Sequence, residues 1–228
     1  MAFKTREVFF AGVSHDLKTP LTVLQGEIEV MQMHLTVDAE TKRSIERISR
    51  EVRRLVWMTN NVLLNAQLES NPVLVPAEVN LREVVEDIER DTRTLAEGLD
   101  LKTSADMALA VHGDYDLLRQ MLLNVVDNAI KFTPRGGSIE LSLRQDDEYA
   151  VLRVADSGTG IPKEHLIRVT EPFYKADSTR RSGGGGVGLG LAIVKQIVEL
   201  HGGQLDIQSQ EGTGTIVTIR LPLLSQYQ

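Results

Sequence analysis

The first seventy residues carry an apolar periodicity that is typical of long amphipathic helices. Apolar side chains recur at three- and four-residue steps between residues 13 and 35, and again between residues 45 and 66. This spacing puts one apolar side chain per turn on the same face of a helix. The two runs are separated at residues 36–38, where Asp38 is a good N-cap for the second helix. We therefore expect an antiparallel helical hairpin over residues 1–70.

A single hairpin of this kind cannot bury both of its apolar stripes. Pairing of two copies into a four-helix bundle would bury them, so we expect a homodimer. Pro72 and Pro76 end the helical periodicity and mark residues 71–77 as a linker. The remainder, residues 78–228, is expected to form a second domain.

The second domain mixes two kinds of periodicity. Its alternating segments predict strands that pair antiparallel, and with three helices they indicate a two-layer α/β sandwich. The expected fold class is therefore multidomain, with an α-helical hairpin followed by an α+β domain. Helices are expected at residues 81–95, 114–132 and 187–201, and strands at residues 99–104, 107–112, 138–145, 149–155, 204–209 and 215–221.

Composition excludes several classes of function. The net charge is −7 and no basic stripe is present, which argues against nucleic acid as a partner. The absence of cysteine excludes disulfides, thiolate catalysis and cysteine-based zinc sites. No apolar run approaches the roughly 18 residues of a membrane span, so this segment is expected to be cytoplasmic and to make no membrane contact. A helix that begins so near residue 1 predicts the cytoplasmic end of a longer, membrane-anchored protein or a trimmed fragment of one.

One histidine in the first helix has chemically suggestive neighbours. His15 points away from the apolar stripe, Asp16 is adjacent, and Thr19 lies one turn further along the same exposed face. A carboxylate that holds one ring N–H leaves the other imidazole nitrogen free as a nucleophile. Taken alone, a histidine such as His15 is more often an ordinary surface residue than a nucleophile.

The expected helix at residues 114–132 carries a possible magnesium and phosphate site. Asn124, Asn128 and Lys131 share one side of it. Amide oxygens suit Mg²⁺, which completes its coordination with phosphates and water, and a lysine ammonium meets phosphate charge directly. The alternative is that these are surface or capping residues.

Three glycine-containing segments complete the pattern. Asp156 follows a strand and can accept a hydrogen bond from an adenine amino group, while the next glycines allow the backbone close to the base; an ordinary turn is the alternative. Residues 183–190 are rich in glycine and precede a helix whose N-terminus can bind phosphate. A flexible linker would also explain these glycines, and neither a βαβ dinucleotide fingerprint nor a P-loop is present. Residues 212–214 by themselves indicate only a hairpin turn.

Two resemblances connect these features. Residues 10–21 resemble the phospho-acceptor box of the sensor histidine kinases of two-component systems. The four later features, in order, resemble the Bergerat-type, or GHKL, ATP-binding domain that these kinases share with chaperone and topoisomerase ATPases. The resemblance covers nearly the whole chain and implies a nucleotide site. Its members would be Asn124, Asn128, Lys131 and Phe132 in the Asn-rich box, Asp156, Gly158 and Gly160 in the adenine box, residues 171–174 at the start of a lid, and Arg180, Gly186, Gly188, Leu189, Gly190 and Thr215 as further nucleotide contacts.

The resemblance also implies an activity. ATP, with Mg²⁺ at Asn128 and Asn124, would phosphorylate His15, and Asp16 would orient and deprotonate the imidazole. The phosphoryl group would then pass to an aspartate of a response regulator receiver domain, and Thr19 implies an additional regulator phosphatase activity. The related ATPases place a catalytic glutamate where Asn124 stands, and an amide cannot take a proton. Two alternatives remain at this point, namely a non-catalytic nucleotide-sensing scaffold and a protein serine kinase of the same ATP fold.

Overall fold

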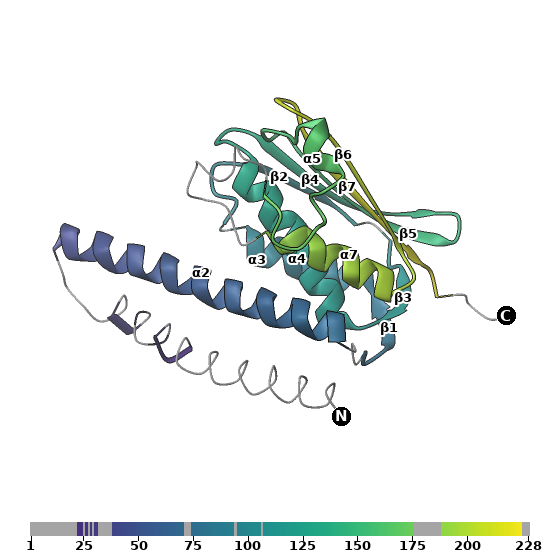
Figure 1. Cartoon of the computed structure of the whole chain (residues 1–228), viewed down its shortest axis with the longest axis horizontal. Helices are drawn as coiled ribbons and strands as arrows, with labels where there is room; N and C mark the ends of the chain where they lie inside the picture. Colours follow the sequence, from purple (N-terminus) through teal and green to yellow (C-terminus); the bar gives the residue numbers. More distant parts are fainter. Residues whose placement is uncertain are drawn as a thin grey trace. The chain divides into compact units, whose positions relative to one another are not determined.

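The chain divides into two compact units, Met1–Pro72 and Val73–Gln228. In the computed structural model (Figure 1), the described residues are 22–24, 26, 28, 30–31, 38–70, 74–93, 95–105, 107–175 and 188–224.

The first unit contains one long described helix, α2, which runs from Ala39 to Ser70. Asp38 caps it, because Oδ1 accepts a hydrogen bond from the backbone N–H of Thr41 at 2.8 Å and Oδ2 accepts one from the Thr41 hydroxyl at 3.1 Å. These hydrogen bonds, the backbone one first, lower the pKa of Asp38. The predicted second helix and its N-cap are confirmed. Those residues between 22 and 31 that the structure describes are also helical.

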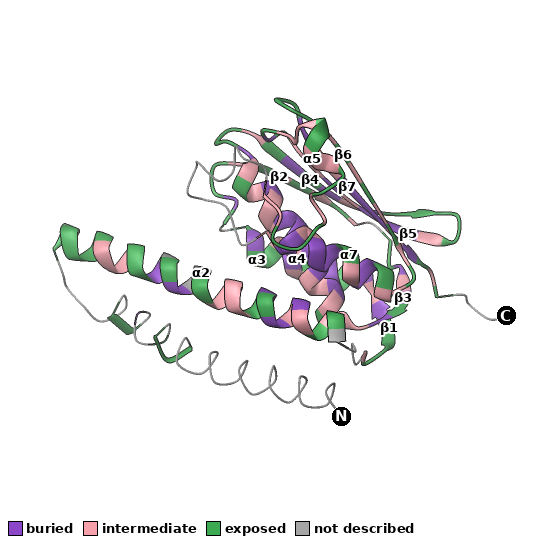
Figure 2. Cartoon of the chain, viewed as in Figure 1, coloured by how far each residue is buried: buried purple, intermediate pink, exposed green. Residues whose placement is uncertain are grey.

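Apolar side chains remain exposed along α2. Ile48, Leu55 and Val62 stand seven residues apart, and 55%, 49% and 39% of their surfaces are exposed. Figure 2 shows that exposed and buried positions alternate along this helix. Residues seven apart return to nearly the same side of a helix, so these three form a partly exposed apolar stripe on α2.

The second unit is built on a five-stranded sheet with the strand order β2-β4-β5-β7-β6. The strands β4, β5, β7 and β6 pair antiparallel, whereas β2 is parallel to β4. The prediction of antiparallel pairs was therefore wrong for β2. The chain between β2 and β4 passes through β3 (Ala110–Gly113) and α4 (Tyr115–Phe132), and a connection of this length allows a parallel return. The strand bounds are β2 Asp100–Ser104, β4 Ser138–Asp146, β5 Tyr149–Asp156, β6 Gln204–Gln210 and β7 Gly214–Pro222.

A second, two-stranded sheet joins β1, Ala77–Asn80, to β3, Ala110–Gly113. Ala77 lies at the end of the segment expected to be a linker, and the sequence analysis did not predict β1. Four residues are too few to show a clear alternation, and the pairing partner is distant in sequence. The strand expected at residues 107–112 is observed as β3, a few residues later.

Three helices cover one face of the large sheet (Figure 1). They are α3, Leu81–Thr92; α4, Tyr115–Phe132; and α7, Gly190–Leu200. All three were predicted, and a fourth, short helix, α5 at Lys163–Leu166, was not. The core between helices and sheet is apolar, and its largest fully buried members include Leu118, Met121, Leu122, Ile139, Leu152, Ile193, Ile197 and Ile219.

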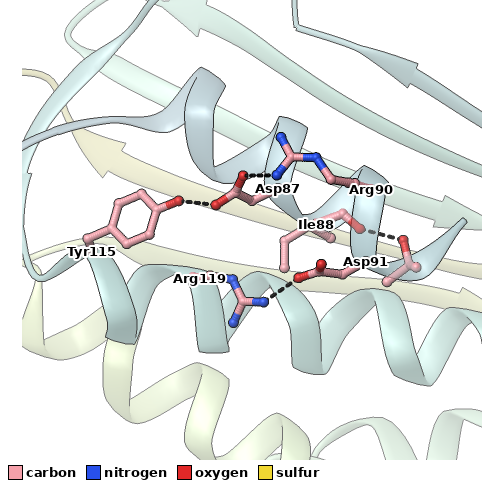
Figure 3. A network of polar contacts seen from close by, with 7 residues as sticks. Asp87, Ile88, Arg90, Asp91, Tyr115 and Arg119 are labelled. Carbon is pink, nitrogen blue, oxygen red and sulfur yellow. Dashed lines mark hydrogen bonds and ion pairs between the residues drawn. The ribbon is translucent and has the colours of Figure 1, made fainter.

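A polar network joins α3 to α4 on their outer side (Figure 3). The Tyr115 hydroxyl donates to Asp87 Oδ2 at 2.6 Å, Asp87 also pairs with Arg90 at 3.1 Å, and Arg119 pairs with Asp91. The hydrogen bond to the Asp87 carboxylate raises the pKa of Tyr115 to about 12. Because the ion pairs are partly exposed, solvent screens them and they add little to the free energy of unfolding. The network therefore contributes mainly to the orientation of α3 relative to α4.

Candidate active site

Helix α4 and the beginning of α7 meet where the magnesium and phosphate residues were expected. The Asn128 side chain is half-buried, and its Nδ2 would lie 3.5 Å from a Cβ atom added to Gly190. Asn124 lies one turn earlier on α4 and is only 1% exposed. Its Oδ1 already accepts a hydrogen bond from Gln120 Nε2 at 3.2 Å, and its Nδ2 has no partner among the described residues. Of the two amides, Asn128 therefore has the geometry better suited to a metal ion.

The last turn of α4 contributes a charge and a carbonyl group. Lys131 forms an ion pair with Asp127 on the same helix. The Phe132 carbonyl accepts the backbone N–H of Thr159 at 3.1 Å, which ties the end of α4 to the loop after β5. The backbone of Phe132 thus joins two parts of the candidate site.

Asp156 ends the central strand β5 with its two carboxylate oxygens in different environments. Oδ1 accepts the backbone N–H groups of Gly158 at 2.8 Å and of Thr215 at 3.3 Å. Oδ2 accepts no hydrogen bond from any residue in the described part of the chain. Burial raises the pKa of the Asp156 carboxyl, and the two backbone hydrogen bonds oppose this shift. The side chain is therefore oriented by the backbone N–H groups of Gly158 and Thr215, and its Oδ2 remains available to a donor from a ligand.

The loop after Asp156 packs so tightly that two of its positions exclude side chains. A Cβ atom on Gly158 would lie 2.6 Å from both Asp156 Oδ1 and the Phe132 carbonyl oxygen. Gly160 has φ +68°, and a Cβ atom there would lie 2.0 Å from the Gln210 carbonyl oxygen. Substitution at either position would therefore displace the loop.

The turn between β6 and β7 belongs to the same cluster of loops, which its sequence alone did not indicate. The Gly212 N–H donates to the Thr159 carbonyl at 2.8 Å. Ser209, which the sequence analysis missed, accepts the Ile161 N–H at 2.8 Å, and its Oγ lies 2.9 Å from Thr215 Oγ1. Only the register of β6 against β7, which pairs Ser209 with Thr215, would have identified it.

The first turn of α7 presents backbone N–H groups next to Asn128 of α4. Leu189, which is fully buried, precedes the helix and provides no side-chain cap. The Gly188 carbonyl accepts the Phe173 N–H at 2.9 Å, and Gly188 has φ +82°. A helix N-terminus with open N–H groups favours an anion such as phosphate.

Five of the residues predicted for the site lie outside the described part of the chain. They are His15, Asp16, Thr19, Arg180 and Gly186. Among the residues that are described, no three His, Asp or Glu side chains come together in a way that could hold a metal ion. No described helix has both the length and the apolar character needed to cross a membrane.

Two family models match this chain. The His Kinase A (phospho-acceptor) domain matches residues 5–71, and the histidine kinase-, DNA gyrase B-, and HSP90-like ATPase matches residues 113–225. The chain belongs to the sensor histidine kinases. The predicted family and fold class are thereby confirmed.

Named relatives of this sensor histidine kinase are longer proteins. Sensor histidine kinase YclK of Bacillus subtilis (strain 168) is 37% identical over 99% of this chain and 48% of its own length. Phosphate regulon sensor protein PhoR of Pseudomonas aeruginosa is 37% identical over 93% of this chain and 49% of its own. The chain thus spans about half the length of these curated relatives.

Solved structures of histidine kinases resemble the fold. Full-length ShkA in complex with AMPPNP matches 96% of this kinase and 46% of its own chain, with a TM-score of 0.74 and 25% identity. The mycobacterial sensor histidine kinase MprB matches 65% of this kinase and 98% of its own chain, with a TM-score of 0.59 and 34% identity.

Proposed function

We propose that the chain is the catalytic core of a two-component sensor kinase that uses ATP to phosphorylate its own His15. It then transfers the phosphoryl group to an aspartate on the receiver domain of a response regulator. The observation that carries this proposal is the arrangement around Asp156. One of its oxygens is held by two backbone N–H groups, while the other accepts no hydrogen bond from a described residue, beside a loop whose close packing fixes the backbone around Gly158 and Gly160.

Asp156 and the start of α7 would bind different parts of the nucleotide. Asp156 Oδ2 would accept a hydrogen bond from the adenine amino group, and the N–H groups at the start of α7 would bind the phosphates. The complex of ShkA with AMPPNP supports nucleotide binding by this chain, because the match covers 96% of it. ATP supplies the phosphoryl group that is transferred.

A magnesium ion would be held chiefly by Asn128. The half-buried amide oxygen of Asn128 suits this hard cation, which takes its remaining ligands from phosphates and water. Asn124 is enclosed and already hydrogen-bonded through Oδ1, so it would contribute less to metal coordination than Asn128. Magnesium would neutralise charge on the phosphate chain.

His15 would act as the nucleophile. A new N–P bond forms to one ring nitrogen as the bond from the γ-phosphorus to ADP breaks. Asp16 would hold the N–H of the other ring nitrogen and take up its proton. Positioning of the imidazole contributes most of the rate, because phosphoryl transfer asks little covalent chemistry of the protein.

The residue at position 124 favours transfer over hydrolysis of ATP. An amide cannot act as the general base that activates water, and Asn124 already accepts a hydrogen bond from Gln120. ATP bound here would therefore not be hydrolysed readily and would remain intact until it transfers its γ-phosphoryl group to His15.

A second copy of the chain would cover the exposed stripe of α2. The stripe of Ile48, Leu55 and Val62 has the seven-residue spacing with which helices pair in bundles. The phospho-acceptor family model spans this helix as well, which supports dimerisation through the hairpin.

Incubation with ATP labelled at its γ-phosphate tests the proposal. We expect acid-labile, alkali-stable label on the wild-type protein, no label on His15→Gln, and unchanged ATP binding in that variant. The control His112→Gln changes another exposed histidine and should be labelled normally.

Three other outcomes would contradict the proposal. Acid-stable label would indicate a serine kinase, and ADP release without labelled protein would indicate an ATPase. ATP binding with neither label nor turnover would indicate a non-catalytic scaffold.

A further inference from the structure

His201 lies at the end of α7 and makes a hydrogen bond with each nitrogen of its ring. The backbone N–H of Asp114 donates to Nε2 at 3.1 Å, and Nδ1 lies 2.7 Å from the Ile197 carbonyl oxygen. Because a backbone N–H can only donate and a carbonyl can only accept, Nδ1 carries the proton and Nε2 is the acceptor. One imidazole thereby links α7 to the residue that begins α4.

Asp114 joins three segments at this point. It is the N-cap of α4, where Oδ1 accepts the Leu117 N–H at 3.1 Å. Its Oδ2 accepts the Val75 N–H, also at 3.1 Å, from the chain that enters this unit. Through His201, the same residue connects to α7.

The ring packs closely on one side and borders open space on the other. A Cβ atom added to Gly113 would lie 2.5 Å from His201 Cδ2, so glycine is what lets the imidazole approach the end of β3. Beyond the ring is a hollow lined by Leu74, Pro76 and Leu200, among others. Packing alone would therefore not hold the ring in place, and its hydrogen bonds are needed to do so.

Helices α4 and α7 run antiparallel, with this contact at one end and the candidate nucleotide site at the other. Asp114 and Asn128 are separated by about 21 Å along α4, and His201 and Gly190 by about 16 Å along α7, at 1.5 Å per residue. A slip or tilt of α7 at His201 would change the position of Gly190 relative to Asn128. We propose that His201 is a positioning residue that fixes the register of α7 against α4 and so preforms the nucleotide site. This inference rests on the proposed function.

Two amide substitutions separate this role from simple capping of α7. In His201→Gln the side-chain oxygen reaches the place of Nε2, so the link to Asp114 can be retained. In His201→Asn the side-chain nitrogen reaches only the place of Nδ1, so the bond to Ile197 is kept and the link to α4 is lost. If His201 only caps its own helix, glutamine should be the worse replacement.

Nucleotide binding and hydrogen exchange provide the test, with circular dichroism to verify folding. We expect His201→Asn to raise the KM and the Kd for ATP by about 5-fold, as for one lost hydrogen bond, with a smaller change in kcat, and His201→Gln to stay within about 2-fold of wild type. Gly113→Ala keeps the histidine but displaces its ring, and should weaken ATP binding as His201→Asn does.

Equal ATP affinity in the asparagine and glutamine variants, whether normal or weakened, would overturn the inference. Amide exchange measured without nucleotide separates this failure from failure of the proposed function. The inference requires faster exchange of the Asp114 amide and of the first turn of α7 in His201→Asn but not in His201→Gln. Absence of ATP binding by the wild-type protein would instead refute the proposed function.

Discussion

Replacing Asp156 with asparagine changes one oxygen of the site into a donor while keeping the size of the side chain. The N–H groups of Gly158 and Thr215 both point at Oδ1. In the variant they will orient the amide oxygen toward themselves, because an NH₂ group cannot accept their hydrogen bonds. The new NH₂ group must then take the place of Oδ2 and face the base.

The expected loss of affinity follows from this forced orientation. An adenine amino group that met a carboxylate oxygen would now meet another donor. Loss of a charge-assisted hydrogen bond with one group left unpaired costs about 1–3 kcal/mol, which weakens ADP binding by about 5- to 150-fold. A base with a carbonyl at the same ring position can accept from the new NH₂ group, so IDP should lose less affinity than ADP.

Titration calorimetry with ADP and with IDP measures both effects. Asp206→Asn, the same change at an exposed position of β6, is the matched control and should bind both nucleotides as wild type does. An Asp156→Asn protein that binds ADP normally, or that loses ADP and IDP affinity equally, would refute the adenine contact.

The same substitution should also change how stability depends on pH. Burial raises the pKa of Asp156 from its ordinary 3.8, so the neutral carboxyl is favoured in the folded state. This contribution to the free energy of unfolding is complete below pH 3.8 and is lost as the pH rises through the folded-state pKa. Asparagine does not titrate. The stability of Asp156→Asn relative to wild type should therefore increase from about pH 3 to about pH 7 in urea unfolding without nucleotide.

Three further substitutions test other parts of the structure. Asn128→Ala should abolish the difference between ATP affinities measured with Mg²⁺ and with EDTA, and should abolish phosphotransfer; a surviving difference would exclude a metal role. Thr19→Ala should leave autophosphorylation intact but slow regulator dephosphorylation by about 10-fold, or 1.4 kcal/mol, measured as decay of purified phosphorylated regulator with ADP; equal loss of both activities would contradict a dedicated role. Tyr115→Phe removes a group whose pKa is raised from 10.0 to about 12, so its stabilisation is complete below pH 10 and is lost toward pH 12. Urea midpoints should show the variant less stable at pH 8 and closer to wild type at pH 11; a constant gap would argue against the Asp87 bond.

Local patterns were sufficient to predict most elements of the second unit. The helix expected at residues 114–132 is α4, Tyr115–Phe132, with Asp114 as its N-cap, and the hairpin of β4 and β5 was predicted close to its observed bounds. In both cases periodicity and end signals lie within the segment itself. The short strand β1 and the parallel direction of β2 depend on distant partners, and no local pattern contains that information.

The candidate site shows the same distinction. Asp156 and Asn128 could be singled out because their chemistry is evident from residue type and spacing. Ser209, the carbonyl group of Phe132 and the His201–Asp114 contact could not be, since each depends on which backbone atoms the fold brings together. Ordinary serine, phenylalanine and histidine residues give no sign of such contacts in sequence.

The division into Met1–Pro72 and Val73–Gln228 has a consequence for calorimetry. Units with separate cores can melt separately, so the heat-capacity trace is expected to contain two peaks rather than one cooperative transition. If the hairpin associates with a second copy, its peak will move to higher temperature as protein concentration increases, whereas the other peak will respond to nucleotide. A single melting temperature would therefore conceal which half of the molecule a mutation or ligand affects.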